Sequence, residues 1–145
     1  MNDDDLIEQA LAILSRRMRV KSHLGSPAVV RDYLRLLLAG KEHEVFVVVL
    51  LDAQNHVLSC EEMFRGTLTE TSVYPREIVK VALAANAAAA IFAHNHPSEV
   101  SEPSRADESL TRQLKAALAM VDVKVLDHFV IAGSAFTSFA ERGLL

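Results

Sequence analysis

Residues 93–107 read Ala-His-Asn-His-Pro-Ser-Glu-Val-Ser-Glu-Pro-Ser-Arg-Ala-Asp, and they lie between an apolar run and a segment of helical periodicity. If the apolar run is a buried strand, His94 and His96 project from the same face near its end, because alternate residues of a strand share a face. Pro97 cannot donate to a sheet ladder and keeps the residue before it extended, so the strand should end here. The sequence therefore predicts two imidazoles side by side at an open cleft.

A third metal ligand can come from the helix that follows. Asp107 stands eleven residues after His96 and should fall in the first helical turn. Two histidine nitrogens and one carboxylate oxygen, with a fourth position open to water, form the ligand set of a catalytic zinc site. Structural zinc sites usually fill all four positions, often with cysteine, and this chain has one cysteine, Cys60. The stretch is therefore a candidate for a catalytic rather than a structural metal site.

The same residues also have an interpretation without a metal. A histidine at a strand end is often an ordinary surface residue that forms hydrogen bonds. Ser104-Arg-Ala-Asp107 fits a capping box, in which the Ser104 hydroxyl and the Asp107 carboxylate accept from each other's backbone amides. The residues alone leave both interpretations open.

A further carboxylate, Glu44, opens the apolar run Glu-Val-Phe-Val-Val-Val-Leu-Leu-Asp, which is typical of a central strand covered on both faces. A glutamate before a buried strand is commonly solvated. If this strand neighbours the one that ends at His96, Glu44 can instead accept a proton from a metal-activated water and deliver it to a leaving amine. Glu42, two residues earlier on the same face, is a weaker candidate for that role.

The chain of 145 residues has a formal net charge of -4 and a pI near 5.8. One domain of this size can bury a core without disulfides or a structural metal. The acidic balance argues against a surface built mainly to bind phosphates. Arg16, Arg17, Arg19 and Lys21 form a basic group that is either a nucleic-acid contact or a solvated helix end favoured by the helix dipole.

Targeting features are missing from the sequence. The N-terminus is acidic and lacks the positive region of a secretory signal, and no apolar run reaches the roughly 18 residues of a membrane span. Cys60 alone cannot form an internal disulfide. We therefore expect a soluble cytoplasmic protein without a membrane partner, and the oligomeric state is left open, a homodimer included.

The hydrophobic periodicity predicts the order of the remaining elements. Helices are expected at 3–20, 27–39 with Ser26 as N-cap, 74–88 and 104–121, and strands at 44–52, 57–64, 87–93, 123–132 and in one last short segment, with 67–72 as an ambiguous edge strand. This order fits a three-layer α/β domain. We expect residues 1–41 to form an N-terminal helical segment packed on a domain of residues 42–145.

These motifs resemble those of a known family. Glu44, His94-x-His96-Pro97 and Ser104-x-x-Asp107 resemble the JAMM motif of JAB/MPN-domain metalloproteins. The bacterial RadC family is resembled more closely still, in the segments Glu61-Glu-Met-Phe-Arg-Gly-Thr-Leu-Thr, Tyr74-Pro-Arg-Glu, Asn86-Ala-Ala-Ala-Ala-Ile-Phe-Ala-His-Asn-His-Pro-Ser98 and Leu126-Asp-His-Phe-Val-Ile. The resemblance covers roughly residues 42–145.

The resemblance implies a fold and a set of roles. The fold is a cytidine-deaminase-like α/β domain, with a central mixed, curved sheet flanked by helices. His94, His96 and Asp107 would be the ligands of Zn²⁺, Glu44 the base that acts on the metal water, and Ser104 the hydroxyl that stabilises the oxyanion. Because related JAMM proteins hydrolyse peptide or isopeptide bonds, the resemblance implies a zinc-dependent metallohydrolase with a peptide or protein substrate.

Two departures from the family pattern stand out. Glu99 occupies a position where the family usually has glycine. If the loop requires a positive φ there, Glu99 costs about 1 kcal/mol or more; otherwise it places a carboxylate beside the cleft. Full-length members also carry an N-terminal helix-hairpin-helix-like region, and this chain has about 40 residues before Glu44, so we expect a short form.

Other functions are weighed against the hydrolase. The family's name suggests a non-catalytic accessory of DNA repair or replication, or a binding module that retains the metal site, although the acidic chain weakens direct nucleic-acid binding. A zinc nucleobase deaminase needs His-x-Glu and Pro-Cys-x-x-Cys, and neither occurs. An HNH-type nuclease would need a ββα-metal unit around His94-Asn95-His96.

The pair Asp127-His128 belongs to the RadC pattern without belonging to the ligand motif. His128 can act as a donor that orients a metal ligand. It can equally be a hydrogen-bonded histidine of the sheet.

Overall fold

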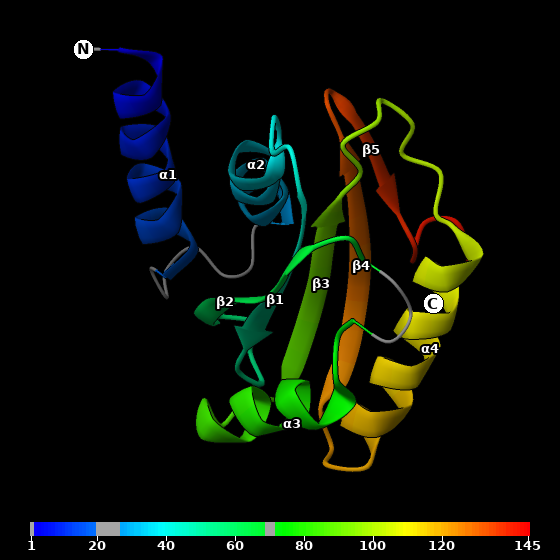
Figure 1. Ribbon diagram of the computed structural model, residues 1–145. Helices are drawn as coiled ribbons and strands as arrows, with labels where there is room; N and C mark the ends of the chain where they lie inside the picture. The colour runs from blue at the N-terminus through cyan, green and yellow to red at the C-terminus, as the bar shows by residue number, and fades with distance from the viewer. Residues whose placement is uncertain (1, 20–26, 69–71) are drawn as a thin grey trace.

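The computed structural model describes residues 2–19, 27–68 and 72–145, which form a mixed sheet with helices on both sides (Figure 1). In chain order the elements are α1 (Asp3–Arg19), α2 (Pro27–Leu38), β1 (Glu44–Leu51), β2 (Val57–Gly66), α3 (Pro75–Ala84), β3 (Ala89–Asn95), α4 (Arg105–Ala119), β4 (Lys124–Ala132) and β5 (Ala135–Ser138). The strands lie in the order β2-β1-β3-β4-β5. The predicted α/β class, with a mixed sheet flanked by helices, is confirmed.

Strand β3 is the centre of the sheet. It pairs antiparallel with β1 and parallel with β4, while β2 and β5 pair antiparallel with β1 and β4 at the two edges. Both β1 and β3 are buried almost throughout, as expected for apolar runs covered on both faces. These directions bring the start of β1 together with the ends of β3 and β4 at one end of the sheet.

The pleat of the strands divides the core into two layers. One layer joins Met18 of α1 and the apolar face of α2 to the sheet, through Val30, Leu34, Leu38, Val45, Val47, Val49 and Ile131. The other joins α3 and α4 to the opposite face, through Phe46, Val48, Leu50, Phe92, Ile78, Ala82, Leu110, Leu114 and Leu118. Each fully buried Leu or Phe side chain contributes about 1.5–3 kcal/mol, so both layers hold the sheet in place.

Helix α3 is shorter than the helix predicted over 74–88. Asn86 takes a positive φ of 54°, and the Ala87 amide donates to the Ala82 carbonyl at 2.9 Å. This arrangement is a Schellman-type helix end, in which the left-handed residue is usually glycine and sometimes asparagine. The alanine tract therefore enters β3 instead of extending the helix, although alanine is the best helix former.

The other elements agree with the prediction to within a few residues, with one exception. Thr67, Leu68 and Ser72 are not in a strand, and 69–71 lie outside the described residues, so the ambiguous edge strand is not supported where it can be seen. Residues 20–26, including the predicted N-cap Ser26, also lie outside the described part. The division of the chain at residue 42 stays a prediction.

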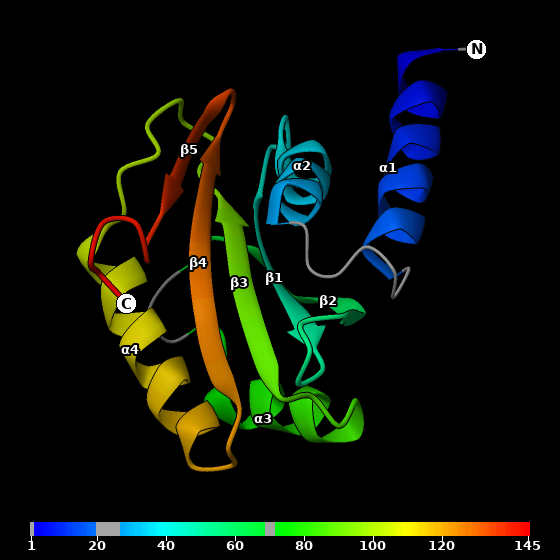
Figure 2. The same ribbon diagram turned by 180° about the vertical axis from the view of Figure 1, so that it is seen from behind.

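Helix α1 lies beside α2 at the edge of the molecule in both views (Figures 1 and 2). Met18 anchors its last turn in the core, whereas Leu6, Ile7 and Ile13 remain 58%, 41% and 42% exposed. In residues 2–19, 27–68 and 72–145, no helix has both the length and the apolar character that crossing a bilayer requires.

Candidate metal centre

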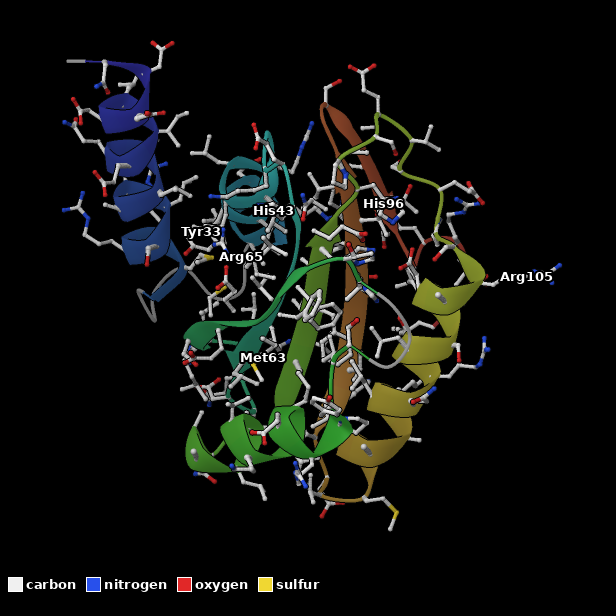
Figure 3. All side chains as sticks on the ribbon, viewed as in Figure 1. Tyr33, His43, Met63, Arg65, His96 and Arg105 are labelled. Atoms are coloured by element: carbon white, nitrogen blue, oxygen red, sulfur yellow. The ribbon has the colours of Figure 1, made fainter. Side chains whose placement is uncertain are left out.

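His94, His96 and Asp107 meet at the end of β3. The Nε2 atoms of the two imidazoles lie 3.2 Å apart. His94 Nε2 lies 3.2 Å from Asp107 Oδ1, and His96 Nε2 lies 3.0 Å from Asp107 Oδ2. Figure 3 shows His96 at the end of the sheet away from α3. The predicted projection of both histidines from one face is therefore present, and the first turn of α4 returns the carboxylate to them.

The donor set fits a metal ion. Ligand bonds of about 2.0–2.1 Å in a tetrahedron place neighbouring ligand atoms about 3.3 Å apart. The three separations between His94, His96 and Asp107 lie close to that value. Lone pairs of imidazole and carboxylate at such distances repel one another unless a cation or protons lie between them. These three side chains thus form a group that can hold a metal ion.

The Asp107 carboxylate is held by the capping box as well. Ser104 Oγ accepts from the Asp107 amide at 3.0 Å, and Asp107 Oδ2 accepts from the Ser104 amide at 2.8 Å. The two interpretations of this motif are therefore compatible, since one carboxylate caps α4 and faces the imidazoles. The capping box therefore holds the Asp107 carboxylate in place without a metal ion.

His96 is oriented by the loop that follows it. Its Nδ1 lies 3.0 Å from the carbonyl oxygen of Val100. A carbonyl can only accept, so Nδ1 carries hydrogen and donates. In the neutral imidazole Nε2 then has the lone pair that a metal requires.

His94 is oriented from inside the core. Its Nδ1 lies 2.7 Å from His128 Nε2, and His128 Nδ1 lies 2.6 Å from Thr111 Oγ1, which donates to the Asp107 carbonyl at 2.7 Å. His94 and His128 are fully buried, and Thr111 is 1% exposed. The sequence left the role of His128 open and gave no role to Thr111. The available signal was a polar residue on the apolar side of α4, next to Leu110.

The close contacts and burial of these side chains change their pKa values. Burial raises the pKa of Asp107, but the His94 and His96 imidazoles beside its carboxylate outweigh burial and, when they carry hydrogen on Nε2, hold that pKa well below its usual range. The hydrogen bond to Asp107 raises the pKa of His96 against the effect of burial, and the charge of Glu44 adds to the rise. Burial lowers the pKa of His128 well below its ordinary value, so this imidazole is neutral.

Glu44 lies on β1, opposite the end of β3 that carries the candidate metal ligands. The register of β1 and β3 pairs Phe46 with His94, which places Glu44 opposite His96. Alternation puts Glu44 on the face of Phe46, whose ring stacks on the His94 imidazole at 6.2 Å. Glu44 Oε1 accepts from the Leu68 amide at 3.3 Å. The condition that the strand of Glu44 neighbour the strand of His96 is thus met.

Asn95, between the two histidines, faces the other side of the sheet. Its Oδ1 accepts from the Val45 amide at 2.6 Å, and its Nδ2 donates to the His43 carbonyl at 2.9 Å. These bonds hold the backbone on both sides of Glu44. Sequence reasoning missed this role, although a polar residue inside a buried strand was a signal for it.

A cleft of about 340 Å³ opens beside His96. Its lining includes Lys41, Glu42, Asn95, Pro97 and Glu99. Among the described residues other than glycine, positive φ occurs at Asn55, Asn86 and Asp122, so Glu99 carries no such strain. Glu99 lines this cleft together with His96, whereas His94 and Asp107 do not line it, so a carboxylate of Glu99 beside the metal ligands stays a prediction.

Two other groups noted in the sequence lie away from the triad. Asp127 accepts from the Ser138 hydroxyl at 2.6 Å and the Ala140 amide at 3.0 Å, which ties β4 to the C-terminal turn. Arg16 and Arg17 of the basic group are exposed, and Lys21 lies outside the described residues. Within the part of the chain that the structure describes, Asp127, Arg16 and Arg17 have no contact with the candidate metal ligands.

A mixed α/β sheet that brings two histidines of its central strand to an aspartate of the next helix is the arrangement expected of a JAB-type metal-binding domain. Residues 24–144 match the family model described as the RadC-like JAB domain. The chain belongs to the RadC family, as its motifs predicted.

Relatives with similar sequences support this membership. The chain is 64% identical over 140 residues to a UPF0758 protein of Thiobacillus denitrificans, a match that covers 97% of this chain and 62% of that relative. A UPF0758 protein of Dechloromonas aromatica is 66% identical over 133 residues, with 91% of this chain and 59% of the relative covered. The chain therefore spans less than two thirds of these relatives, and the expected short form stays a prediction.

Proposed function

We propose that this protein is a zinc-dependent hydrolase of the JAMM type, which cleaves a peptide, isopeptide or other amide bond. The observation that carries the proposal is the convergence of His94, His96 and Asp107, with three ligand atoms 3.0–3.2 Å apart, opposite Glu44 on the neighbouring strand. Three protein ligands leave one position of a tetrahedral ion open, which is typical of catalytic rather than structural zinc.

His94, His96 and Asp107 would hold the ion, which would act as a Lewis acid. When bound, Zn²⁺ would polarise the scissile carbonyl and lower the pKa of a bound water to about 7. Two neutral imidazoles and one carboxylate suit zinc, although similar ligand sets also accept other first-row metals. Zinc is therefore the first metal to test.

Glu44 is the proposed general base. Its side chain lies on the same face as the ligands, and its charge already acts on His96. The hydrogen bond from the Leu68 amide to Oε1 orients the carboxylate and leaves Oε2 available to a water. In this role Glu44 takes a proton from the attacking water and gives it to the leaving amine.

Ser104 is the proposed donor to the developing oxyanion. Its Oγ uses a lone pair to accept from the Asp107 amide, which leaves the hydroxyl hydrogen able to donate. The side chain is exposed, so a substrate carbonyl can approach it. A single well-placed donor of this kind contributes about 10²–10³ in kcat.

The test is hydrolysis by the zinc-loaded protein of a panel of peptides and isopeptides. Glu44→Gln should reduce the rate at least about 10²-fold, as expected for a general base, while its zinc content stays unchanged. Glu42→Gln is the matched control, because Glu42 is an exposed carboxylate two residues away. Equal rates in wild type and Glu44→Gln would contradict the proposed role of Glu44.

A zinc-loaded protein that cleaves nothing in the panel would favour the alternative, a binding module or a DNA-repair accessory. A gel-shift titration with DNA at increasing salt separates these two, because phosphate contacts weaken steeply with salt. The net charge of -4 makes strong DNA binding an unexpected result.

A further inference from the structure

We propose that His128 and Thr111 are positioning residues of the metal centre, which hold the His94 imidazole in the tautomer whose Nε2 is free of hydrogen. They do so through a buried series of hydrogen bonds, from His94 to His128 to Thr111 to the Asp107 carbonyl, called here the histidine–threonine chain. The role rests on the proposed metal centre, and it concerns two side chains outside the JAMM motif.

The Asp107 carbonyl determines which atom donates in each hydrogen bond of the histidine–threonine chain. The Asp107 carbonyl oxygen can only accept, and Thr111 Oγ1 lies 2.7 Å from it, so the single hydroxyl hydrogen of Thr111 points there. Thr111 Oγ1 therefore faces His128 with a lone pair. Because the Nδ1 atom of His128 lies 2.6 Å from that oxygen, it must carry hydrogen and donate.

The surroundings of His128 then determine its other nitrogen. The imidazole is fully buried and lies among the rings of Phe46, Phe92 and Phe139, with centroids 5.6, 5.8 and 4.5 Å away. Such an environment disfavours the charged form, so His128 carries one hydrogen, which is on Nδ1. Its Nε2 is an acceptor for His94.

His94 consequently donates from Nδ1 to His128, 2.7 Å away. A neutral imidazole has hydrogen on one nitrogen only, so His94 Nε2 presents its lone pair toward His96 and Asp107. This is the form that binds a metal, since a nitrogen that carries hydrogen cannot be a ligand.

The chain matters because the opposite tautomer has a partner of its own. With hydrogen on Nε2, His94 would donate to Asp107 Oδ1 at 3.2 Å, and this closed pair would occupy two of the three ligand groups. In that case the lone pairs of His94 Nδ1 and His128 Nε2 would face each other at 2.7 Å inside the core. The histidine–threonine chain excludes that state through this repulsion.

Two substitutions at His128 isolate the hydrogen bond. His128→Leu removes the acceptor, and His128→Gln offers an amide oxygen to His94, while both lose the ring packing on Phe139. We expect zinc affinity, measured by competition with a chelator, to fall about 10–100-fold in His128→Leu and much less in His128→Gln. Long-range ¹⁵N–¹H NMR of the metal-free protein, with the imidazoles neutral, should find hydrogen on His94 Nδ1 in wild type and on Nε2 in His128→Leu.

Thr111 offers a milder pair in case the His128 variants fail to fold. Thr111→Val keeps the shape and removes the hydroxyl, whereas Thr111→Ser keeps the hydroxyl. We expect weaker zinc binding and loss of the Nδ1 hydrogen of His128 in Thr111→Val, and wild-type behaviour in Thr111→Ser.

The proposal is overturned if His128→Leu and His128→Gln bind zinc equally well and His94 keeps its hydrogen on Nδ1 in both. It is equally overturned if Thr111→Val matches Thr111→Ser in zinc affinity and in the tautomer of His128. The NMR readout needs neither metal nor substrate. A wild-type protein without hydrolytic activity would therefore contradict the proposed function and still show the predicted tautomers.

Discussion

At the end of β3, the polar side chains on the two faces of the sheet differ in whether they have partners within the protein. On the α2 side, Asn95 matches each of its polar groups to a backbone partner, Val45 or His43. On the α4 side, the ligand atoms of His94, His96 and Asp107 face one another at 3.0–3.2 Å. On the α2 side the polar groups of Asn95 all have partners within the protein, so we call this the complete face. On the α4 side the three ligand atoms need a cation or protons between them, so we call this the incomplete face. Successive residues of one strand thus belong separately to the fold and to the candidate metal centre.

The largest expected effect tests the incomplete face. A ligand that binds only the folded state stabilises it by about 4.1 kcal/mol at a concentration of 1,000 Kd. Wild type should therefore gain thermal stability with zinc, with one ion per chain by elemental analysis, and lose that gain in EDTA. His94→Ala/His96→Ala should contain no zinc and show the same melting temperature with and without it. A zinc-dependent shift in the double variant would place the metal elsewhere.

The next effect tests the complete face. Asn95→Ala leaves the Val45 amide and the His43 carbonyl without their side-chain partner, and a buried polar group left unpaired costs about 1–3 kcal/mol. We expect the free energy of unfolding, measured by urea denaturation of the metal-free protein, to fall by about 3 kcal/mol. At saturating zinc the variant should still hold one ion per chain. If Asn95→Ala lost zinc as completely as the double histidine variant, the two faces would not be separable.

Ser104 is the N-cap of α4 and also the proposed donor to the oxyanion. Ser104→Ala removes the N-cap of α4 and should lower the unfolding free energy of the metal-free protein by about 1 kcal/mol, whereas Ser104→Thr keeps the capping oxygen and should lower it by less. The same alanine variant should slow hydrolysis by the zinc-loaded protein, if Ser104 is the oxyanion donor. A change in rate without a change in stability would mean that the cap contributes little here.

Much of this arrangement could be predicted because its signals are local. Spacing by two residues puts His94 and His96 on one face of any strand, and the Ser104-x-x-Asp107 spacing fixes the capping box in any helix. Continuous apolar runs also gave β1 and β3 as central strands. These inferences need only the periodicity of the backbone.

The missed contacts depend on the register between distant segments. Asn95 reaches Val45 across fifty residues because β1 and β3 pair in one particular register, which no local pattern specifies. Likewise, Thr111 meets His128 only after α4 has packed against β4. The end of α3 was misjudged for a different reason, since the left-handed conformation of Asn86 overrode the helix propensity of the alanines after it.

The smallest effect concerns Glu99, in the loop after β3, which lines the cleft beside Asn95 and His96. Because Glu99 does not take a positive φ, Glu99→Gly relieves no strain and only adds freedom to the unfolded chain. We expect Glu99→Gly to lower the unfolding free energy by about 0.4–1 kcal/mol relative to Glu99→Ala, which removes the same carboxylate. Urea denaturation of the two metal-free variants measures the difference. A more stable glycine variant would show that the loop strains its backbone at this position.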